Sequence, residues 1–396
     1  MKLAFVVPRY GRQIRGGAEN AAREMATRLA RDREWSVEVL TTTALDSATW
    51  QEVVGAGTSE EDGVKVHRFA CRSGRDAGFD DYSAPILTRP EQATEEESRR
   101  WIEMQGPVSP DLLDAVAETD ADLLAFYPYL YHPTVAGIRR AARPSVLHPA
   151  AHDEPAIRLP VFRGVFERAA GLVLHTRTER DLVQALFPLA GRPQIVLGLG
   201  IDAPPEPGAE LLPGLDGRPF LLCLGRVDDQ KGTGALWRFF LAYKRRRPGP
   251  LALVLAGPVI DAPPADPDLI VPGAVSEAVK WSLLSQALVM VSPSPFESFS
   301  LVVAESWAAG TPVLVNSLCA ATVENVSRSG GGLRFGGYAE FETALDRLSA
   351  DQRLRVLLAE RGKAFVEANF SWPVVLERYR AFLLSTLGRH PEGSDR

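Results

Sequence analysis

Residues 295–305 read PFESFSLVVAE, and residues 309–313 read AGTPV. One short apolar run, 288–291, comes before this stretch, and another, 312–315, follows it. Apolar runs of this length, bounded by Gly or Pro, are typical of strands buried on both faces of a parallel sheet. The stretch therefore predicts a strand, a loop, a helix over 300–309 and a second strand.

Two glutamates mark the ends of this stretch. Glu297 lies in the loop before the helix, Glu305 lies inside the helix, and at about 1.5 Å rise per residue roughly 10–12 Å separates them. The backbone N–H groups of Phe299, Ser300 and Leu301 lack partners within the helix, and such a helix start attracts anions. The span suits a nucleotide sugar, with hexose hydroxyls at the first glutamate, pyrophosphate at the helix start and ribose hydroxyls at the second. The alternative is a pair of surface glutamates that stabilise the helix dipole.

Short apolar runs alternate with amphipathic stretches along all 396 residues. Since a single core seldom grows past about 250–300 residues, this length favours two domains. Strands are expected at 3–7, 37–41, 64–69, 123–126, 145–148, 172–175, 194–197, 220–224, 251–256, 269–271, 288–291 and 312–315. Helices are expected at 18–31, 233–243, 276–286 and 300–309. Two series of strands and helices indicate an α/β protein with two doubly wound, Rossmann-like domains.

A change in composition predicts the domain boundary. Residues 203–219 read APPEPGAELLPGLDGRP, which is typical of a linker. We therefore expect an N-terminal domain over 1–202, a C-terminal domain over 220–370 and a final helical segment over 371–388. Residues 72–110 are charged and lack a clear period, and we expect an irregular insertion there.

A glycine loop follows the strand expected at 220–224, where residues 225–232 read GRVDDQKG. Gly225 allows close approach of the backbone, and Arg226 and Lys231 can place two positive charges against a diphosphate. These cations would offset the charge that develops on a leaving nucleotide. A solvated loop with ordinary charges is the alternative interpretation.

Two further motifs lie in the first domain. Gly16 and Gly17 precede a helix but lack the complete G-x-G-x-x-G pattern, which disfavours a nicotinamide dehydrogenase. His148 and His152 stand at the end of the strand expected at 145–148, where α/β sheets bind ligands. Each histidine could instead be a hydrogen-bonded structural residue. A metal site is not expected, because neither has further partners at ligand spacing.

Overall composition narrows the classes of function. The net charge of −6 argues against nucleic-acid binding as the main task. Three scattered cysteines form neither a metal motif nor a disulfide framework, which favours a reducing cytoplasm. We expect no signal sequence and no transmembrane span, because the apolar runs are too short.

With these motifs assembled, the sequence resembles glycosyltransferase family 4, a retaining group with the GT-B fold. The resemblance extends from residue 3 to about 385 and is most specific at the E-x7-E element with its GTPV sequence at 310–313. AGP at 256–258 and NFSW at 369–372 also match the family. The resemblance implies two Rossmann-like domains that face each other across a cleft, with the last helix returning to the N-terminal domain.

The resemblance also implies roles for individual residues. Arg226 and Lys231 would bind the diphosphate, Val275 would contact the base, and His152, in competition with His148, would lie near the donor sugar. Many members of the family have glycine where this sequence has Ser298 and Ser300. The implied catalytic residues are His152, Arg226, Lys231 and Glu297, and the implied donor-binding residues are Gly17, Gly225, Gly257, Val275, Ser298, Phe299, Ser300, Leu301 and Glu305.

The expected function is transfer of a hexosyl group from a UDP- or GDP-sugar to an acceptor hydroxyl, in glycan, glycolipid or natural-product glycoside synthesis. We expect no metal and no cofactor, and at most peripheral membrane contact; the acceptor is a glycan, a lipid-linked sugar or a small molecule. A double displacement needs two carboxylates about 5 Å apart. Glu297 and Glu305 are farther apart, which favours a front-face substitution. A nucleotide-sugar epimerase and a non-catalytic nucleotide-sugar binding protein are the alternatives.

Overall fold

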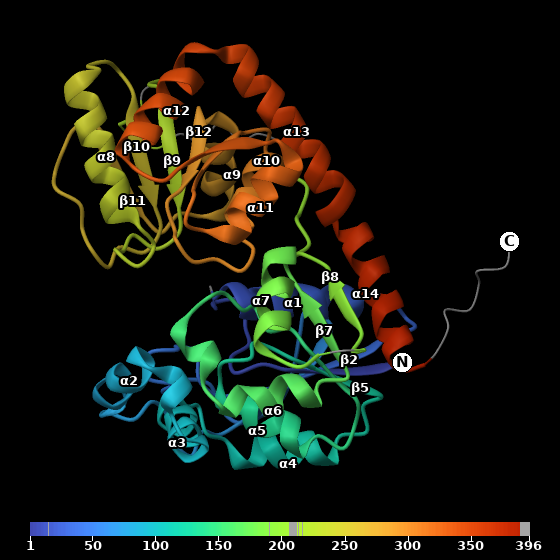
Figure 1. The fold of residues 1–396 in the computed structure, drawn as a ribbon. Helices are drawn as coiled ribbons and strands as arrows, with labels where there is room; N and C mark the ends of the chain where they lie inside the picture. The colour runs from blue at the N-terminus through green and yellow to red at the C-terminus, as the bar shows by residue number, and fades with distance from the viewer. Residues whose placement is uncertain (15, 190, 206–211, 213, 216, 389–396) are drawn as a thin grey trace, which may run out of the picture. The chain divides into compact units, whose positions relative to one another are not determined.

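The computed structural model describes residues 1–14, 16–189, 191–205, 212, 214–215 and 217–388. The chain divides into two compact units (Figure 1): unit 1 contains Met1–Leu197 and the chain from Leu376 onward, and unit 2 contains Gly198–Val375. This division falls a few residues before the predicted domain end at 202. Ile201 is 5% exposed and its N–H donates to Phe370 O, which ties it to the core of unit 2. Much of the linker predicted at 203–219 lies outside the described residues.

Unit 1 contains an eight-stranded sheet in the order β3-β4-β2-β1-β5-β6-β7-β8. The paired strands run parallel, except that β3 is antiparallel to β4. Their bounds are β1 Lys2–Val6, β2 Ser36–Thr42, β3 Gly57–Glu61, β4 Val64–Phe69, β5 Leu123–Phe126, β6 Ser145–Leu147, β7 Gly171–Leu174 and β8 Gln194–Val196. The strand order reverses direction between β1 and β5, the kind of position at which open α/β sheets bind ligands.

The helices of unit 1 cover this sheet. They are α1 Gly17–Leu29, α2 Phe79–Thr88, α3 Glu95–Gln105, α4 Pro110–Glu118, α5 His132–Arg140, α6 Val161–Arg168 and α7 Arg177–Leu186, with 3₁₀ turns at Pro90–Gln92 and Pro155–Arg158. The prediction of an irregular insertion over 72–110 is wrong, because α2 and α3 occupy most of it. Thr94 and Glu97 form a capping box at the start of α3, and Phe79 and Trp101 join the core of the unit.

Unit 2 contains a six-stranded parallel sheet in the order β11-β10-β9-β12-β13-β14. The strands are β9 Phe220–Leu224, β10 Ala252–Ala256, β11 Leu269–Gly273, β12 Val289–Ser292, β13 Val313–Asn316 and β14 Gly332–Phe335. The helices are α8 Thr233–Arg246, α9 Glu277–Gln286, α10 Leu301–Ala308, α11 Ala320–Ser329, α12 Tyr338–Ala350, α13 Gln352–Phe370 and α14 Trp372–Thr386.

Two hydrophobic clusters occupy the two faces of this sheet. One cluster joins the sheet to α9, α10 and α11, and the other joins it to α8 and α12. The strand order reverses between β9 and β12, so the loops that follow these two strands open at the same switch point. Those loops contain the two strongest sequence motifs.

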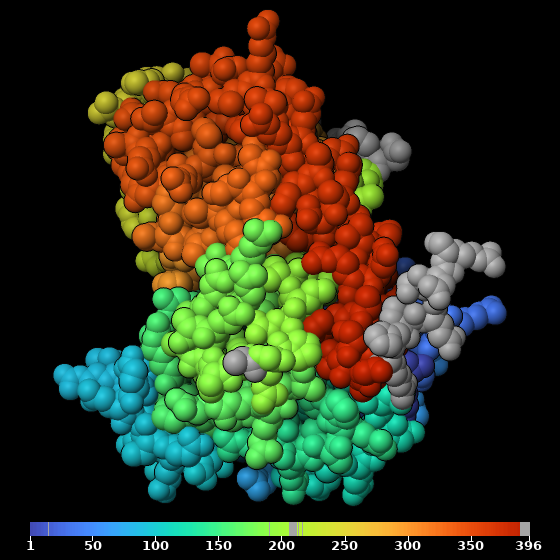
Figure 2. All heavy atoms as spheres, turned by 45° about the vertical axis from the view of Figure 1, so that its right-hand side comes forward, coloured from blue at the N-terminus to red at the C-terminus, as the bar shows by residue number. Residues whose placement is uncertain are grey.

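Helix α14 belongs to both units, which confirms the predicted return of the last helix. From residue 376 onward it packs on unit 1, where Tyr379 Oη and His148 Nε2 are hydrogen-bonded at 2.9 Å. The His148 ring stacks on Tyr127, with 3.9 Å between ring centroids. Tyr379 and Leu383 are fully buried, while the opposite side of the helix lies on the molecular surface (Figure 2, red). None of the described helices is both long enough and apolar enough to cross a membrane.

The burial of His148 predicts a loss of stability in acid. Burial, together with His175 nearby, lowers the pKa of His148, so the folded protein keeps this ring neutral. The unfolded chain takes up a proton below the ordinary pKa of about 6.5. Stability is therefore highest above that pH and falls as the pH decreases, by about 2 kcal/mol between pH 7.5 and 5 for one such histidine.

Replacement of His148 shows how much this residue contributes to the pH dependence of protein stability. In His148→Gln we expect lower stability than in the wild type at pH 7.5, with the difference shrinking by about 2 kcal/mol at pH 5. Urea unfolding at both pH values measures it. Parallel pH dependences for the two proteins would contradict this account.

Candidate functional site

The glycine loop after β9 is held against the loop after β10. Gly225 N–H donates to Ala256 O at 3.0 Å, and Val227 N–H donates to Pro258 O at 2.9 Å. A Cβ on Gly257, whose φ is +154°, would lie 1.9 Å from Gly225 O. Because the two backbones approach so closely, glycine is required at 257. Gly225 itself has φ of +124°, a conformation that favours glycine, so both predicted glycines have a structural reason within unit 2.

Asp228 organises the two cations of this loop. Its Oδ2 lies 3.1 Å from Arg226 Nε, and its Oδ1 accepts the backbone N–H of Lys231 at 2.6 Å. The Asp228 side chain is 7% exposed, whereas that of Arg226 is 52% exposed. A buried carboxylate thus fixes the loop while the guanidinium remains accessible. Asp228 was not predicted from the sequence, although an acidic residue between two cations was visible.

The loop after β9 also contacts the loop after β12. Gly232, the N-cap of α8, has φ of +73°, and a Cβ there would lie 2.5 Å from Pro293 O. Lys231 Nζ donates to Glu297 Oε1 at 2.8 Å, and these side chains are 36% and 22% exposed. Two residues predicted from separate motifs therefore meet. Because an ammonium group has three N–H donors, Lys231 keeps donors for a further partner.

Helix α10 begins at Leu301 with an unusual N-cap. Ser300 has φ of +70°, is 6% exposed and provides no side-chain cap for the helix. Phe299 is buried and its ring packs against Phe370 at 4.9 Å, which holds the turn in place. The first N–H groups of the helix have no acceptors inside it. Ser298 precedes this turn and is half-buried.

Glu305 lies on α10 beside α9. Lys280 Nζ donates to Glu305 Oε1 at 2.8 Å and lies 2.7 Å from Glu277 Oε2. Burial lowers the pKa of Lys280, but the two carboxylates more than offset this effect, so its pKa is raised. Val275 lies half-buried just before Ser276, whose side chain caps α9. Lys280 was not predicted from the sequence.

In unit 1, the predicted glycine pair begins α1. Gly16 is the N-cap and Gly17 the first helical residue, and a Cβ on Gly17 would meet nothing within 4 Å. Glu19, which is 6% exposed, accepts from Arg9 Nε at 2.9 Å, and the Arg9 guanidinium lies 5.7 Å from the Trp50 ring centroid. The backbone at Gly17 is therefore open to a ligand, whereas Glu19 is engaged.

The two candidate histidines have different surroundings. His148 is 2% exposed in the core, which leaves no room for a ligand. His152 is 32% exposed, and its Nε2 lies 3.6 Å from Glu154 Oε2. Glu154 accepts a 2.7 Å hydrogen bond from Tyr129 Oη, and Asp153 pairs with Arg158 at 2.6 Å. Of the two histidines, His152 is the accessible one.

A buried carboxyl group supports the loop of His152. Glu179 on α7 accepts from the backbone N–H of Ala151 and of His175, both at 2.6 Å. Burial raises the pKa of Glu179 to about 8, against the opposing effect of these N–H donors. This residue links the loops after β6 and β7. Its sequence signal is Thr176-x-x-Glu179, a helix-capping pattern.

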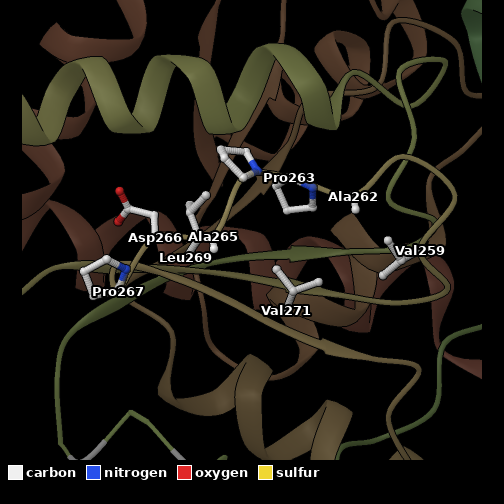
Figure 3. Close-up of a pocket in the computed structure, with 9 residues that line it drawn as sticks. Val259, Ala262, Pro263, Ala265, Asp266, Pro267, Leu269 and Val271 are labelled. Carbon is white, nitrogen blue, oxygen red and sulfur yellow. The ribbon is translucent and has the colours of Figure 1, made fainter.

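Three hollows among the described residues of unit 2 have linings that include none of the predicted site residues. One hollow of about 600 Å³ beside α8 has a mostly apolar lining with one carboxylate, that of Asp266 (Figure 3). Its lining provides no cation for a phosphate. Among the described residues, no group of three or more His, Cys, Asp or Glu side chains is arranged to hold a metal ion.

Comparison with known proteins adds a family match and structural neighbours. Residues 218–351, roughly a third of the chain, match the family described as Glycosyl transferases group 1. A search of curated proteins finds no match. The fold is similar to sucrose-phosphate synthase from Thermosynechococcus elongatus, with 18% identity over 98% of this chain and 99% of that chain and a TM-score of 0.69.

Two further structures share the fold at 14% identity. Anabaena HepE, in complex with UDP and glucose, matches with a TM-score of 0.68 over 97% of this chain and 100% of that chain. The E. coli trehalose-6-phosphate structure, bound with UDP-2-fluoro glucose, matches with a TM-score of 0.70 over 99% of this chain and 100% of that chain. These similarities confirm the predicted GT-B fold with two Rossmann-like units. The family match lies entirely within unit 2, which contains the candidate site.

The N-cap of α10 generates a stability prediction. The left-handed conformation costs a residue with a Cβ roughly 1–2 kcal/mol, and glycine adopts it without that cost. Because Ser300 has φ of +70°, we expect Ser300→Gly to stabilise the protein by about 1 kcal/mol. Ser300→Ala, which keeps the Cβ, should give no such gain. Urea unfolding of the three proteins measures this, and equal effects of Gly and Ala would contradict it.

Proposed function

We propose that the protein is a glycosyltransferase that moves a sugar from a nucleotide sugar to an acceptor hydroxyl, with the donor bound in unit 2. The observation that carries this proposal is the Lys231–Glu297 pair, which places a cation and a carboxylate together at the switch point. The match of residues 218–351 to Glycosyl transferases group 1 supports it independently.

In the proposed donor complex, each half of the nucleotide sugar meets a different part of the site. Arg226, Lys231 and the start of α10 bind the diphosphate, because cations and open helix N–H groups both attract anions. Glu297 accepts hydrogen bonds from hydroxyls of the transferred sugar. Glu305 accepts from the ribose, and the backbone near Val275 contacts the base.

We propose a retaining, front-face substitution at the anomeric carbon. The bond from that carbon to the diphosphate oxygen breaks as the bond to the acceptor oxygen forms on the same face. The departing phosphate oxygen takes the acceptor proton. Arg226 and Lys231 stabilise the negative charge that develops on the departing diphosphate, which would allow transfer without a metal ion.

The acceptor would bind to unit 1. Gly17 and His152 are accessible there, and we keep for them the roles implied by the resemblance, donor binding for Gly17 and a place near the donor sugar for His152. Membership of glycosyltransferase family 4 and a cytoplasmic location, at most peripheral to a membrane, complete the proposal. Cys71, Cys223 and Cys319 are all free thiols, which suits a reducing compartment. UDP-glucose is the first donor to test, because structures of similar fold contain UDP with glucose and UDP-2-fluoro glucose.

A panel of UDP- and GDP-sugars tests donor binding directly. A donor that binds the folded state raises the melting temperature by mass action. Absence of stabilisation by every nucleotide sugar would refute the proposed function. Isomerisation of the sugar without an acceptor would indicate an epimerase instead, and binding without turnover would indicate a non-catalytic binding protein.

Removal of the Lys231 ammonium group should reduce catalysis much more than folding. We expect Lys231→Ala to lower turnover about 10²–10³-fold, the usual effect of losing one group that stabilises transition-state charge. The melting temperature should hardly change, because the Lys231 side chain is 36% exposed. The measurement is release of nucleoside diphosphate in the presence of acceptor.

Two variants serve as controls for Lys231→Ala. Lys363→Ala removes an exposed lysine elsewhere in unit 2 and should leave turnover unchanged. Lys231→Arg keeps the positive charge and should retain more activity than the alanine variant. Near-normal turnover in Lys231→Ala would rule out the proposed role.

A further inference from the structure

Lys280 is a well-enclosed lysine on α9. Its side chain and that of Glu305 are each 18% exposed, whereas its other partner, Glu277, is 79% exposed. The Nζ atom lies 5.2 Å from the centroid of the Trp281 ring, which covers it further. Because water screens a half-enclosed ion pair less than an exposed one, the pair with Glu305 is the stronger of the two.

This pair fixes the carboxylate of Glu305 in one orientation. A carboxylate has two oxygens and about four acceptor positions, and the Lys280 bond to Oε1 uses one of them. The remaining positions stay available to hydroxyl donors.

An oriented carboxylate discriminates between ligands with and without a hydroxyl. A hydroxyl that donates to a charged acceptor forms one of the stronger hydrogen bonds in proteins. An analogue without that hydroxyl leaves a half-buried carboxylate unsatisfied, which is the main source of selectivity for hydroxyl groups. A carboxylate that can rotate loses most of this selectivity.

We propose that Lys280 is a positioning residue that, by holding Glu305, makes the nucleotide site select ribose over deoxyribose. This inference rests on the proposed function, because it takes Glu305 as the residue that meets the ribose. It adds a determinant of specificity on α9, outside the two loops that bind the diphosphate and the sugar.

The test compares binding of a ribonucleoside diphosphate with binding of its 2′-deoxy and 3′-deoxy analogues. The probe is UDP or GDP, whichever binds the wild type, and calorimetry measures the affinities. We expect the wild type to prefer the ribonucleotide over at least one analogue by roughly tenfold or more. In Lys280→Met this ratio should fall toward one, while affinity for inorganic pyrophosphate is unchanged.

Companion variants separate positioning from general damage. Glu305→Gln should lose the same selectivity, and the double variant Lys280→Met/Glu305→Gln should lose no more than either single variant, since the two residues act as one unit. Lys280→Arg keeps the positive charge and should retain part of the preference for the ribonucleotide. Glu277→Gln and Lys363→Met should leave it intact, because the first removes an exposed partner and the second an exposed lysine.

Each outcome has a distinct meaning. Failure of the wild type to bind any nucleoside diphosphate would refute the proposed function. Two other results would overturn only the role of Lys280. One is a wild type that binds the ribonucleotide and its deoxy analogues equally well, and the other is a Lys280→Met variant with the wild-type ratio of affinities. If Lys280→Met does not fold, the other two variants decide the question. The role of Lys280 is then overturned if both Lys280→Arg and Glu305→Gln keep the wild-type ratio of ribonucleotide to deoxynucleotide affinity.

Discussion

The contact between the loops after β9 and β12 is the constraint on which the candidate site depends. Gly232 allows the two backbones to meet, and Lys231 and Glu297 then form an ion pair across the contact. These loops leave adjacent strands at the point where the strand order reverses, so the parallel sheet itself brings them together. Helix α10 starts from the same place, and its N-cap Ser300 provides no side-chain cap. The sheet topology therefore determines where charge, helix start and carboxylate converge.

The two expected cations in unit 2, and Lys280 in addition, are each paired with a carboxylate. Arg226 pairs with Asp228, Lys231 with Glu297, and Lys280 with Glu305. The pairs differ in exposure, and this difference separates their roles. The accessible Arg226 and Lys231 can turn toward an incoming diphosphate, whereas the enclosed Lys280 orients its partner. A site with alternating charges can thus recognise a ligand that is anionic in its middle and rich in hydroxyls at both ends.

Buried apolar runs made most of the fold predictable, because a strand covered on both faces must be apolar throughout. The edge strand β3, with the sequence GTSEE, lacks that signal and was missed. The helices over 72–110 were missed because few of their side chains, such as Phe79 and Trp101, enter the core. Motif residues were found from local spacing. Partners such as Lys280 and Glu179 act through contacts that only the folded chain creates, and their roles, like those of the motif residues, remain proposals.

The division of α14 between the two units has a consequence for biosynthesis. Residues 376–386 are made only after the whole of unit 2 has been synthesised, yet they provide Tyr379 and Leu383 to the core of unit 1. A nascent chain therefore carries a first sheet with one uncovered region while the second sheet folds. Sequence order and folding order differ here, and the N-terminal unit is the last to be completed.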